Sequence, residues 1–310
     1  MPGMERRELL KTASVAAGTV ALAGLASATT AAAAPVRGAR AGSGTLNVRW
    51  IGGGVVEIAT PDNKQLAYVD AWVWNNAAYT VLKVERPAEF ASASAFSDYV
   101  AARSPDAVLV MLTHDHGDHM GDYFELLKAL SDAGLPVKTT GQSDLMRGGL
   151  PQKFRDAGLD PAQLVLNAGA AQNFGGMARH GAMTTWLVPA VHSNLLGYPA
   201  AGFVLEVGGV RVYASGDTDL YGDMRMIADR YHPDIALVCA GGGPYTMGPR
   251  DAAVACQLIG VSQAVPIHYG HNPQVLGAQA ADEFRAALGE IAPGTTVQVI
   301  GLGESRAISV

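Results

Sequence analysis

Short apolar runs alternate with helical patterns along most of the chain. Brief apolar runs bounded by turn residues are typical of buried strands, whereas apolar residues that recur every three or four positions predict a helix. Leu126, Leu127 and Leu130 recur in the second way. We expect strands at residues 46–51, 55–59, 66–70, 107–112, 185–189, 202–207, 210–214, 235–239, 264–267 and 296–300. We expect helices at residues 93–102, 120–133, 220–231, 249–260 and 279–288.

The order of these elements predicts a layered α/β domain in which one sheet packs against another. Early strands are followed by helices, and the pattern recurs after residue 184. A hairpin over residues 202–214 is expected to turn at Gly208 and Gly209, which suit the positive backbone angles of a primed turn. With no internal linker and no fixed-period repeat, residues 42–310 are expected to form a single domain.

The first 41 residues have a different character and are expected to be an export signal and linker. Arg6 and Arg7 stand just before residues 12–36, which carry no charge and are rich in Ala, Gly and Thr. This arrangement resembles a twin-arginine signal, with a small-x-small cleavage site at residues 39–41. It predicts a partner in the twin-arginine export machinery, a periplasmic or extracellular protein, and no stable membrane anchor after cleavage. An uncleaved, weakly inserting anchor is the alternative.

Composition excludes several classes of protein. The chain has 22 basic and 28 acidic residues, a net charge of −6 and no lysine-rich block, which argues against binding to nucleic acid. A hydrophobic content of 49% excludes a disordered chain. Two cysteines, Cys239 and Cys256, can build neither a disulfide framework nor a cysteine zinc cluster, and we expect both to be buried free thiols.

Four metal-binding side chains lie within six residues, directly after a predicted buried strand. His114, His116, Asp118 and His119 have the spacing H-x-H-x-D-H. In a loop, the first two histidines can face one centre while the next two residues face a second one beside it. Imidazole and carboxylate suit zinc, manganese or iron. The alternative, in which Asp115 or Asp118 caps the next helix, explains an aspartate but not three clustered histidines.

Three more candidates stand where later strands end. His192 follows the strand at 185–189, Asp217 follows 210–214 and His268 follows 264–267. Loops at strand ends are common positions for functional side chains on a rigid scaffold. Each residue alone could be structural, but together with the histidine-rich segment they complete two metal centres.

The order H-x-H-x-D-H, His, Asp, His resembles the metallo-β-lactamase superfamily of binuclear hydrolases. The resemblance implies a four-layer αβ/βα sandwich with two divalent ions, zinc first and manganese or iron as alternatives. It places one ion on His114, His116 and His192. It places the other on Asp118, His119 and His268, with Asp217 bridging the two and a metal-bridged hydroxide as nucleophile. Two glycine-rich phrases, residues 241–249 and 266–270, resemble the ascorbate-6-phosphate lactonase-like subgroup.

The chain departs from that subgroup at two positions. Asp70 is followed by Ala71 where the subgroup commonly has proline, and residues 51–54 lack the histidine that usually follows the first strand. We expect Asp118 and Asp217 to act in catalysis through the metals. Asp70 is a third catalytic candidate, either orienting a metal-binding histidine or approaching a metal, with a turn aspartate as the structural alternative.

Aromatic and polar residues near the motifs predict a wall for a small-molecule substrate. The candidate substrate-binding residues, each with ordinary core or loop packing as its alternative, are Trp72, Trp74, Tyr198, Tyr245 and His271.

We expect hydrolysis of a lactone or another ester or amide bond. A phosphodiesterase or phosphatase and a hydrolytic dehalogenase are alternatives on the same metal centre, and a non-catalytic exported metal-binding protein is an alternative of another class. The oligomeric state stays open.

Overall fold

The computed structural model describes residues 42–310, so the predicted export signal and linker lie outside the described residues. Within 42–310, no helix combines the length and the apolar character that crossing a bilayer requires. The described residues form two sheets with helices outside them.

Residues from the first half of the domain, joined by the last strand, build the first sheet. Its order is β13-β1-β2-β3-β4-β5, and β3 runs parallel to β4 and β4 to β5. The strands are β1 (Thr45–Gly52), β2 (Val55–Ala59), β3 (Gln65–Val69), β4 (Ala107–Met111), β5 (Val137–Thr140) and β13 (Ser305–Ser309).

The second sheet has the order β12-β11-β10-β9-β8-β7-β6, with β9, β10 and β11 parallel to one another. Its strands are β6 (Met177–His180), β7 (Met183–Pro189), β8 (Ala201–Val207), β9 (Val210–Ala214), β10 (Ile235–Cys239), β11 (Gln263–Ile267) and β12 (Thr296–Val297). Because β8 is antiparallel to both β7 and β9, the strands β7, β9, β10 and β11 all point the same way.

Helices pack around the two sheets. Those of the first half are α1 (Ala78–Val81), α2 (Ala93–Ala101), α3 (Gly117–Met120), α4 (Tyr123–Asp132), α5 (Pro151–Asp156) and α6 (Pro161–Leu164). Those of the second half are α7 (Arg225–Tyr231), α8 (Pro249–Ile259) and α9 (Gln279–Ile291). Short 3₁₀ turns lie at Ala88–Phe90 and Gly222–Met224, and a π-helical turn at Leu145–Gly149.

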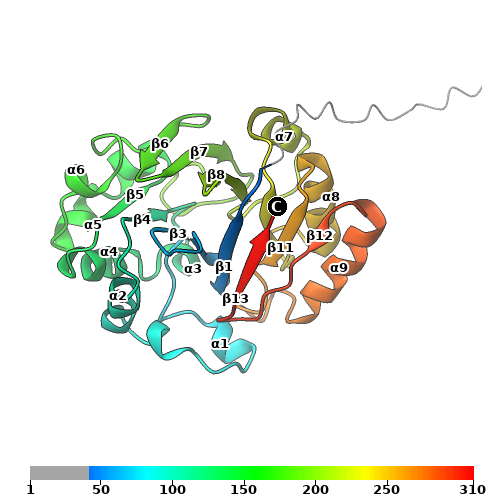
Figure 1. The fold of residues 1–310 in the computed structure, drawn as a ribbon, viewed down its shortest axis with the longest axis horizontal. Coiled ribbons are helices and arrows are strands. Elements are labelled where there is room, and N and C mark those ends of the chain that lie inside the picture. Colours follow the sequence, from blue (N-terminus) through cyan, green and yellow to red (C-terminus); the bar gives the residue numbers. More distant parts are fainter. Residues whose placement is uncertain (1–41) are drawn as a thin grey trace, which may run out of the picture. The chain divides into compact units, whose positions relative to one another are not determined.

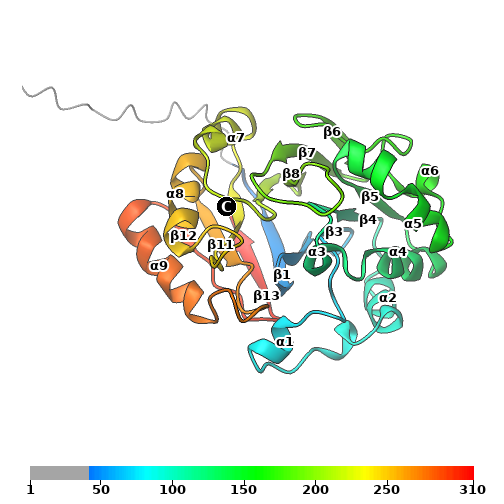
Figure 2. The ribbon, with the colours of Figure 1, turned by 180° about the vertical axis from the view of Figure 1, so that it is seen from behind.

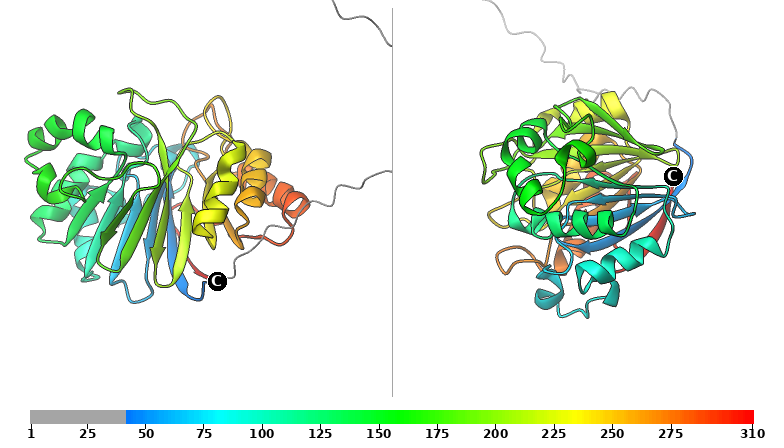
Figure 3. Two further views of the ribbon diagram at one scale, coloured as in Figure 1. Left: turned by 90° about the horizontal axis from the view of Figure 1, so that it is seen from above. Right: turned by 90° about the vertical axis from the view of Figure 1, so that its left-hand side faces the viewer.

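The layers stack as helix, sheet, sheet, helix. Figure 3 shows the sheets side by side, with α7, α8 and α9 on one outer side and α4, α5 and α6 on the other. Figures 1 and 2 show the same separation from the front and from behind. Buried side chains from both sheets, such as Leu109 and Leu205, belong to one core cluster, while Cys256 of α8 and Val238 belong to a second. The predicted four-layer sandwich is therefore confirmed.

Several predicted elements differ in their bounds, and some were missed. The helix expected at 120–133 begins only at Tyr123, and the short α3 precedes it. The last predicted strand, 296–300, is reduced to the two residues of β12. Edge strands β6 and β13 were missed because half or more of the side chains in each are exposed, so they show no apolar run. The predicted turn at Gly208 and Gly209 has φ values of +58° and +80°, as a primed turn requires.

Candidate metal centre

The first sheet supplies the histidine-rich segment. Strand β4 ends at Met111, and the chain then passes His114 and His116 before α3 begins at Gly117. His116 is the N-terminal cap residue of α3, and its side chain makes no capping hydrogen bond. The carboxylate of Asp115 accepts hydrogen bonds from the amides of Leu195 and Leu196 instead. Asp115 therefore does not act as the helix cap that the structural alternative invoked.

The second sheet supplies the other three candidates. His192 follows β7, Asp217 follows β9 and His268 follows β11, all at carboxyl ends of strands that point the same way. Side chains at such ends gather at one edge of a sheet. The two sheets thus bring residues more than 150 positions apart into one cluster.

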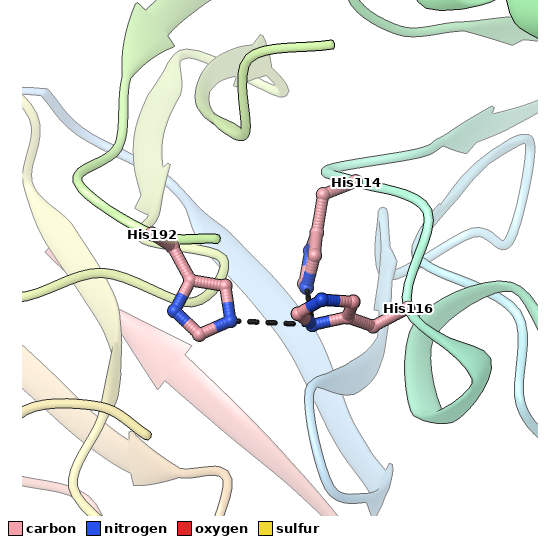
Figure 4. Close-up of side chains that lie close together, drawn as sticks. All are labelled: His114, His116 and His192. Atoms are coloured by element: carbon pink, nitrogen blue, oxygen red, sulfur yellow. Dashed lines mark hydrogen bonds between the residues drawn. The ribbon is translucent and has the colours of Figure 1, made fainter. Parts of the chain in front are cut away.

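Three of these histidines form a first group, shown in Figure 4. The Nδ1 atom of His116 lies 3.0 Å from Nε2 of His114 and 3.3 Å from Nε2 of His192. The hydroxyl of Thr113 lies 2.9 Å from a carboxylate oxygen of Asp70 and 3.0 Å from Nδ1 of His114. A hydroxyl that donates to Asp70 accepts from Nδ1–H of His114, which leaves the lone pair of Nε2 facing the group.

Asp118, His119, Asp217 and His268 form the second group. Oδ1 of Asp217 lies 3.0 Å from Nε2 of His268 and 3.3 Å from Nε2 of His119. Its other oxygen, Oδ2, lies 3.5 Å from Nε2 of His192, which belongs to the first group. Asp217 therefore spans both groups with its two oxygens. Asp118 stands at the open side of the second group, with Oδ2 3.5 Å from Nε2 of His268.

Burial and charge set the protonation of these residues. Burial, together with the neighbouring His119, lowers the pKa of His114 well below its usual value. Burial alone would raise the pKa of Asp217, but His268 and His119 outweigh it and hold that pKa well below its usual value. Burial likewise acts to lower the pKa of His119, but the surrounding carboxylates, Asp217 first, raise it well above. The second group is therefore a negatively charged pocket that favours a cation.

Asp70 lies behind His119 and orients it. Its Oδ1 accepts from the amide of Thr113 at 2.7 Å, and its Oδ2 lies 2.7 Å from Nδ1 of His119. This contact fixes the ring of His119 so that Nε2 is directed toward Asp217. Both oxygens of Asp70 are thus occupied by protein donors. Of the two functional roles considered for Asp70, the geometry favours that of a positioning residue over that of a ligand.

The backbone near His119 is strained at two residues and closely packed at a third. Asp70 and His268 both adopt the left-handed conformation, with φ of +59° and +60°. Such strain in residues other than glycine costs about 1–3 kcal/mol and concentrates at functional sites. Gly54 approaches His119 so closely that an added Cβ would lie 2.6 Å from its Cε1 atom. Only glycine leaves room for the imidazole at this position.

The donor set fits divalent metal ions. Imidazole nitrogens that face one another cannot all be satisfied by protons, because each proton serves one acceptor. Two buried ring nitrogens here have no hydrogen-bond partner among the described residues, namely Nδ1 of His268 and Nδ1 of His271. Three nitrogens in one group, and two nitrogens with two carboxylates in the other, are ligand sets that zinc, manganese and iron accept.

A cavity of about 560 Å³ opens directly onto both groups. Trp72, Tyr245 and His271 line it, as do Ser193 and Asn272. The ring of His271 lies 4.2 Å from that of His268, and its Nε2 is 3.5 Å from Oδ2 of Asp118. Burial lowers the pKa of His271 to about 3, so its ring is neutral near pH 7.

Two predicted substrate-binding residues lie elsewhere. The indole nitrogen of Trp74 donates to Glu125 at 3.2 Å, and its ring packs near Phe96. The ring of Tyr198 covers Gly148 and Gly149 of the π-helical turn. Neither residue is among the described residues that line the cavity. Their structural alternatives, loop and core packing, describe their contacts better.

Sequence reasoning missed three residues that support the site. Thr113 connects Asp70 to His114, Asp115 holds the loop after His192, and Ser193 lines the cavity. Asp115 carried a signal, since an aspartate stands between two candidate ligands. Thr113 and Ser193 carried none, because their partners come from other parts of the chain.

Known proteins match this chain over most of its length. The profile of the Beta-lactamase superfamily domain matches residues 89–269. A UPF0173 metal-dependent hydrolase of Cupriavidus metallidurans is 32% identical over 273 residues, which cover 83% of this chain and 82% of the relative. This chain belongs to the UPF0173 metal-dependent hydrolases of the beta-lactamase superfamily.

A second relative and a solved structure are also similar to this chain. A UPF0173 metal-dependent hydrolase of Methanoregula boonei is 36% identical over 67% of this chain and 85% of its own length. The structure of Igni18, a metallo hydrolase of Ignicoccus hospitalis, superposes with a TM-score of 0.63 at 25% identity, covering 86% of this chain and 99% of Igni18. The range matched by the superfamily profile contains all seven candidate ligands, whereas Asp70 and His271 lie outside it.

Proposed function

We propose that this metal-dependent hydrolase binds two divalent ions, with zinc as the first choice, and hydrolyses a small lactone or another carboxylic ester or amide. One observation carries the proposal. Two adjacent ligand groups share Asp217 and face a single cavity of about 560 Å³. A volume of this size suits a small molecule rather than a polymer.

The lining of the cavity favours an uncharged carbonyl over a phosphate. Neither lysine nor arginine occurs among the described residues that line it, whereas phosphate sites usually employ such cations. Trp72 and Tyr245 supply aromatic surface, and Ser193 and Asn272 supply neutral polar groups. This composition supports a lactone or ester and weighs against the phosphodiesterase and phosphatase alternatives.

The protein's own groups have separable roles in this proposal. Bound divalent ions would lower the pKa of a water molecule toward neutrality and polarise the substrate carbonyl. Asp217 keeps the two ligand groups together, and Asp70 keeps Nε2 of His119 directed inward. His271, neutral and at the cavity wall, can donate one N–H to an oxygen of the substrate. Trp72 lines the cavity and would keep water away from that side of a bound substrate.

Elemental analysis combined with substrate profiling tests the proposal. We expect two equivalents of metal per chain and turnover of simple lactones or aryl esters, with phosphodiesters and haloaromatics inert. Asp217→Ala should lose both metal and turnover. Equal inactivity of the zinc-loaded protein and of Asp217→Ala on every substrate would refute the hydrolase proposal. Preferential turnover of phosphodiesters would refute the carbonyl substrate.

We also propose that the chain is exported through the twin-arginine route and is cleaved near residue 41. The paired arginines and the uncharged segment after them support this proposal. Sequencing the N-terminus of the secreted or periplasmic protein tests it. Replacing Arg6 and Arg7 by lysine should retain the protein in the cytoplasm, and export of that variant would contradict the route.

A further inference from the structure

Exposed apolar side chains concentrate on the two loops that border the metal centre. Of the nine large apolar side chains exposed in the described residues, three lie between β7 and β8 and one follows β10. They are Val191, Leu195, Leu196 and Tyr245, with exposed fractions of 52%, 71%, 43% and 40%. These four side chains are called the apolar collar below. Clustered apolar exposure of this kind marks binding surfaces, whereas scattered exposure is ordinary.

The collar lies on two loops that also line the cavity. The loop that carries Val191, Leu195 and Leu196 also supplies His192 and Ser193 to the cavity wall, and Tyr245 lines the cavity itself. A molecule that fills the cavity and extends outward along these loops reaches Tyr245, and then the exposed side chains beside His192 and Ser193. Neither the described residues that line the cavity nor the four collar residues include a lysine or an arginine. The part of the ligand that extends out of the cavity therefore need not carry a charge.

Buried hydrogen bonds hold part of the collar in its exposed position. The carboxylate of Asp115, itself only 5% exposed, accepts from the amide of Leu195 at 2.8 Å and from that of Leu196 at 2.6 Å. At the other side, the hydroxyl of Tyr245 donates to Gln274. Because Asp115 stands between two candidate ligands, it holds the leucines beside the metal-binding loop. The apolar surface is thus present before any ligand arrives.

We propose that the substrate carries an apolar chain or ring of several carbons that lies on the collar while its carbonyl group enters the cavity. This inference rests on the proposed function, since it names the kind of lactone or ester that the site selects. Burial of apolar area beyond the reacting bond would favour long-chain or ring-bearing substrates over short ones.

Binding of saturated fatty acids tests the collar without requiring turnover. Octanoate and butanoate share the carboxylate that a metal centre binds, and they differ by four methylenes. Full burial raises affinity about fourfold per methylene. Since the collar is open to solvent, we expect zinc-loaded full-length protein to bind octanoate about tenfold more tightly in calorimetry. In the double variant Leu195→Ser/Leu196→Ser, the preference for octanoate over butanoate should fall below about threefold, while the zinc content stays unchanged.

Met226→Ser is the matched control, because Met226 is 52% exposed on α7, outside the collar; it should keep the wild-type ratio. Failure of octanoate to bind, equal affinity for both acids, or an unchanged ratio in the double variant would overturn the collar. The collar would also be overturned if the double variant lost oligomers and kept the wild-type preference for octanoate over butanoate. The leucines would then form a contact between two copies of the chain. Lactone turnover without chain-length preference refutes the collar alone, whereas chain-length preference without lactone turnover refutes the proposed reaction alone.

Discussion

Two clusters of buried charge lie in this domain, and they differ in how their charges are satisfied. On the first sheet, Glu57 is 4% exposed and accepts two hydrogen bonds from the guanidinium of Arg103, both at 2.8 Å. The hydroxyls of Tyr68 and Tyr99 donate to the same carboxylate at 2.6 and 3.0 Å. Every oxygen of Glu57 therefore has a donor from the protein.

The metal centre is built in the opposite way. Nδ1 of His268 and Nδ1 of His271 are buried without a hydrogen-bond partner among the described residues, and the nitrogens of His114, His116 and His192 face one another. Unsatisfied buried polar groups cost about 1–3 kcal/mol each, so a fold keeps them where another interaction compensates. The Glu57 cluster holds α2 against the sheet, whereas the Asp217 cluster is suited to bind something the chain does not supply.

The largest effect expected of a single substitution comes from breaking the Glu57 cluster. Arg103→Met leaves the carboxylate of Glu57 buried without its cation and should lower the free energy of unfolding by about 3–5 kcal/mol. Chemical denaturation measures this change. The metal content of the folded variant should equal that of the wild type. Loss of metal in the folded variant would show that the two clusters are coupled, which would contradict their independence.

Metal removal should act only on the other cluster. Chelation is expected to lower the free energy of unfolding by about 2.7 kcal/mol for each of the two proposed ions, relative to protein held at metal concentrations one hundredfold above Kd. Thermal unfolding with and without chelator measures the change. The same increment is expected in Arg103→Met, because the two clusters share no partner. A chelator-insensitive melting temperature would remove the evidence for resident metal.

Asp70→Asn tests how the second ligand group is oriented. Asp70 accepts from the amide and hydroxyl of Thr113 and from Nδ1 of His119, so an asparagine NH₂ would face a donor. We expect metal affinity to fall by about 10–100-fold, as for other residues that hold a metal-binding histidine. Competition with a chromophoric chelator measures the affinity, and Asp62→Asn, on an exposed turn, is the control. Unchanged affinity would mean that His119 does not need its orienting partner.

The smallest expected effect is at Asp115. Asp115→Ala removes both acceptors for the amides of Leu195 and Leu196 and frees the loop that carries His192. We expect affinity for one of the two metal equivalents to fall by about tenfold, at the low end for supporting residues. Asp160→Ala also removes an acceptor for a backbone amide, that of Ala162, and should leave both equivalents unchanged. Equal weakening of both equivalents would show that Asp115 supports the whole centre rather than His192.

Sequence reasoning placed the candidate site better than its surroundings. The seven candidate ligands lie together because each follows a strand whose apolar run is visible in the sequence, and the carboxyl ends of these strands share one edge. Trp74 and Tyr198 were misplaced because an aromatic residue near a motif in sequence can turn either way from a loop. The edge strands β6 and β13 were missed since their exposed side chains carry no apolar pattern.

The sequence by itself determined the layered α/β class, the H-x-H-x-D-H segment and the residues that join it, since period and spacing are local properties. Only the tertiary structure decided that Asp70 orients His119, that Asp217 spans both groups and that Asp115 holds the loop after His192. These relations depend on how two sheets approach each other. No local pattern carries that information, because the partners are separated by many residues and meet only when the core between the sheets is packed.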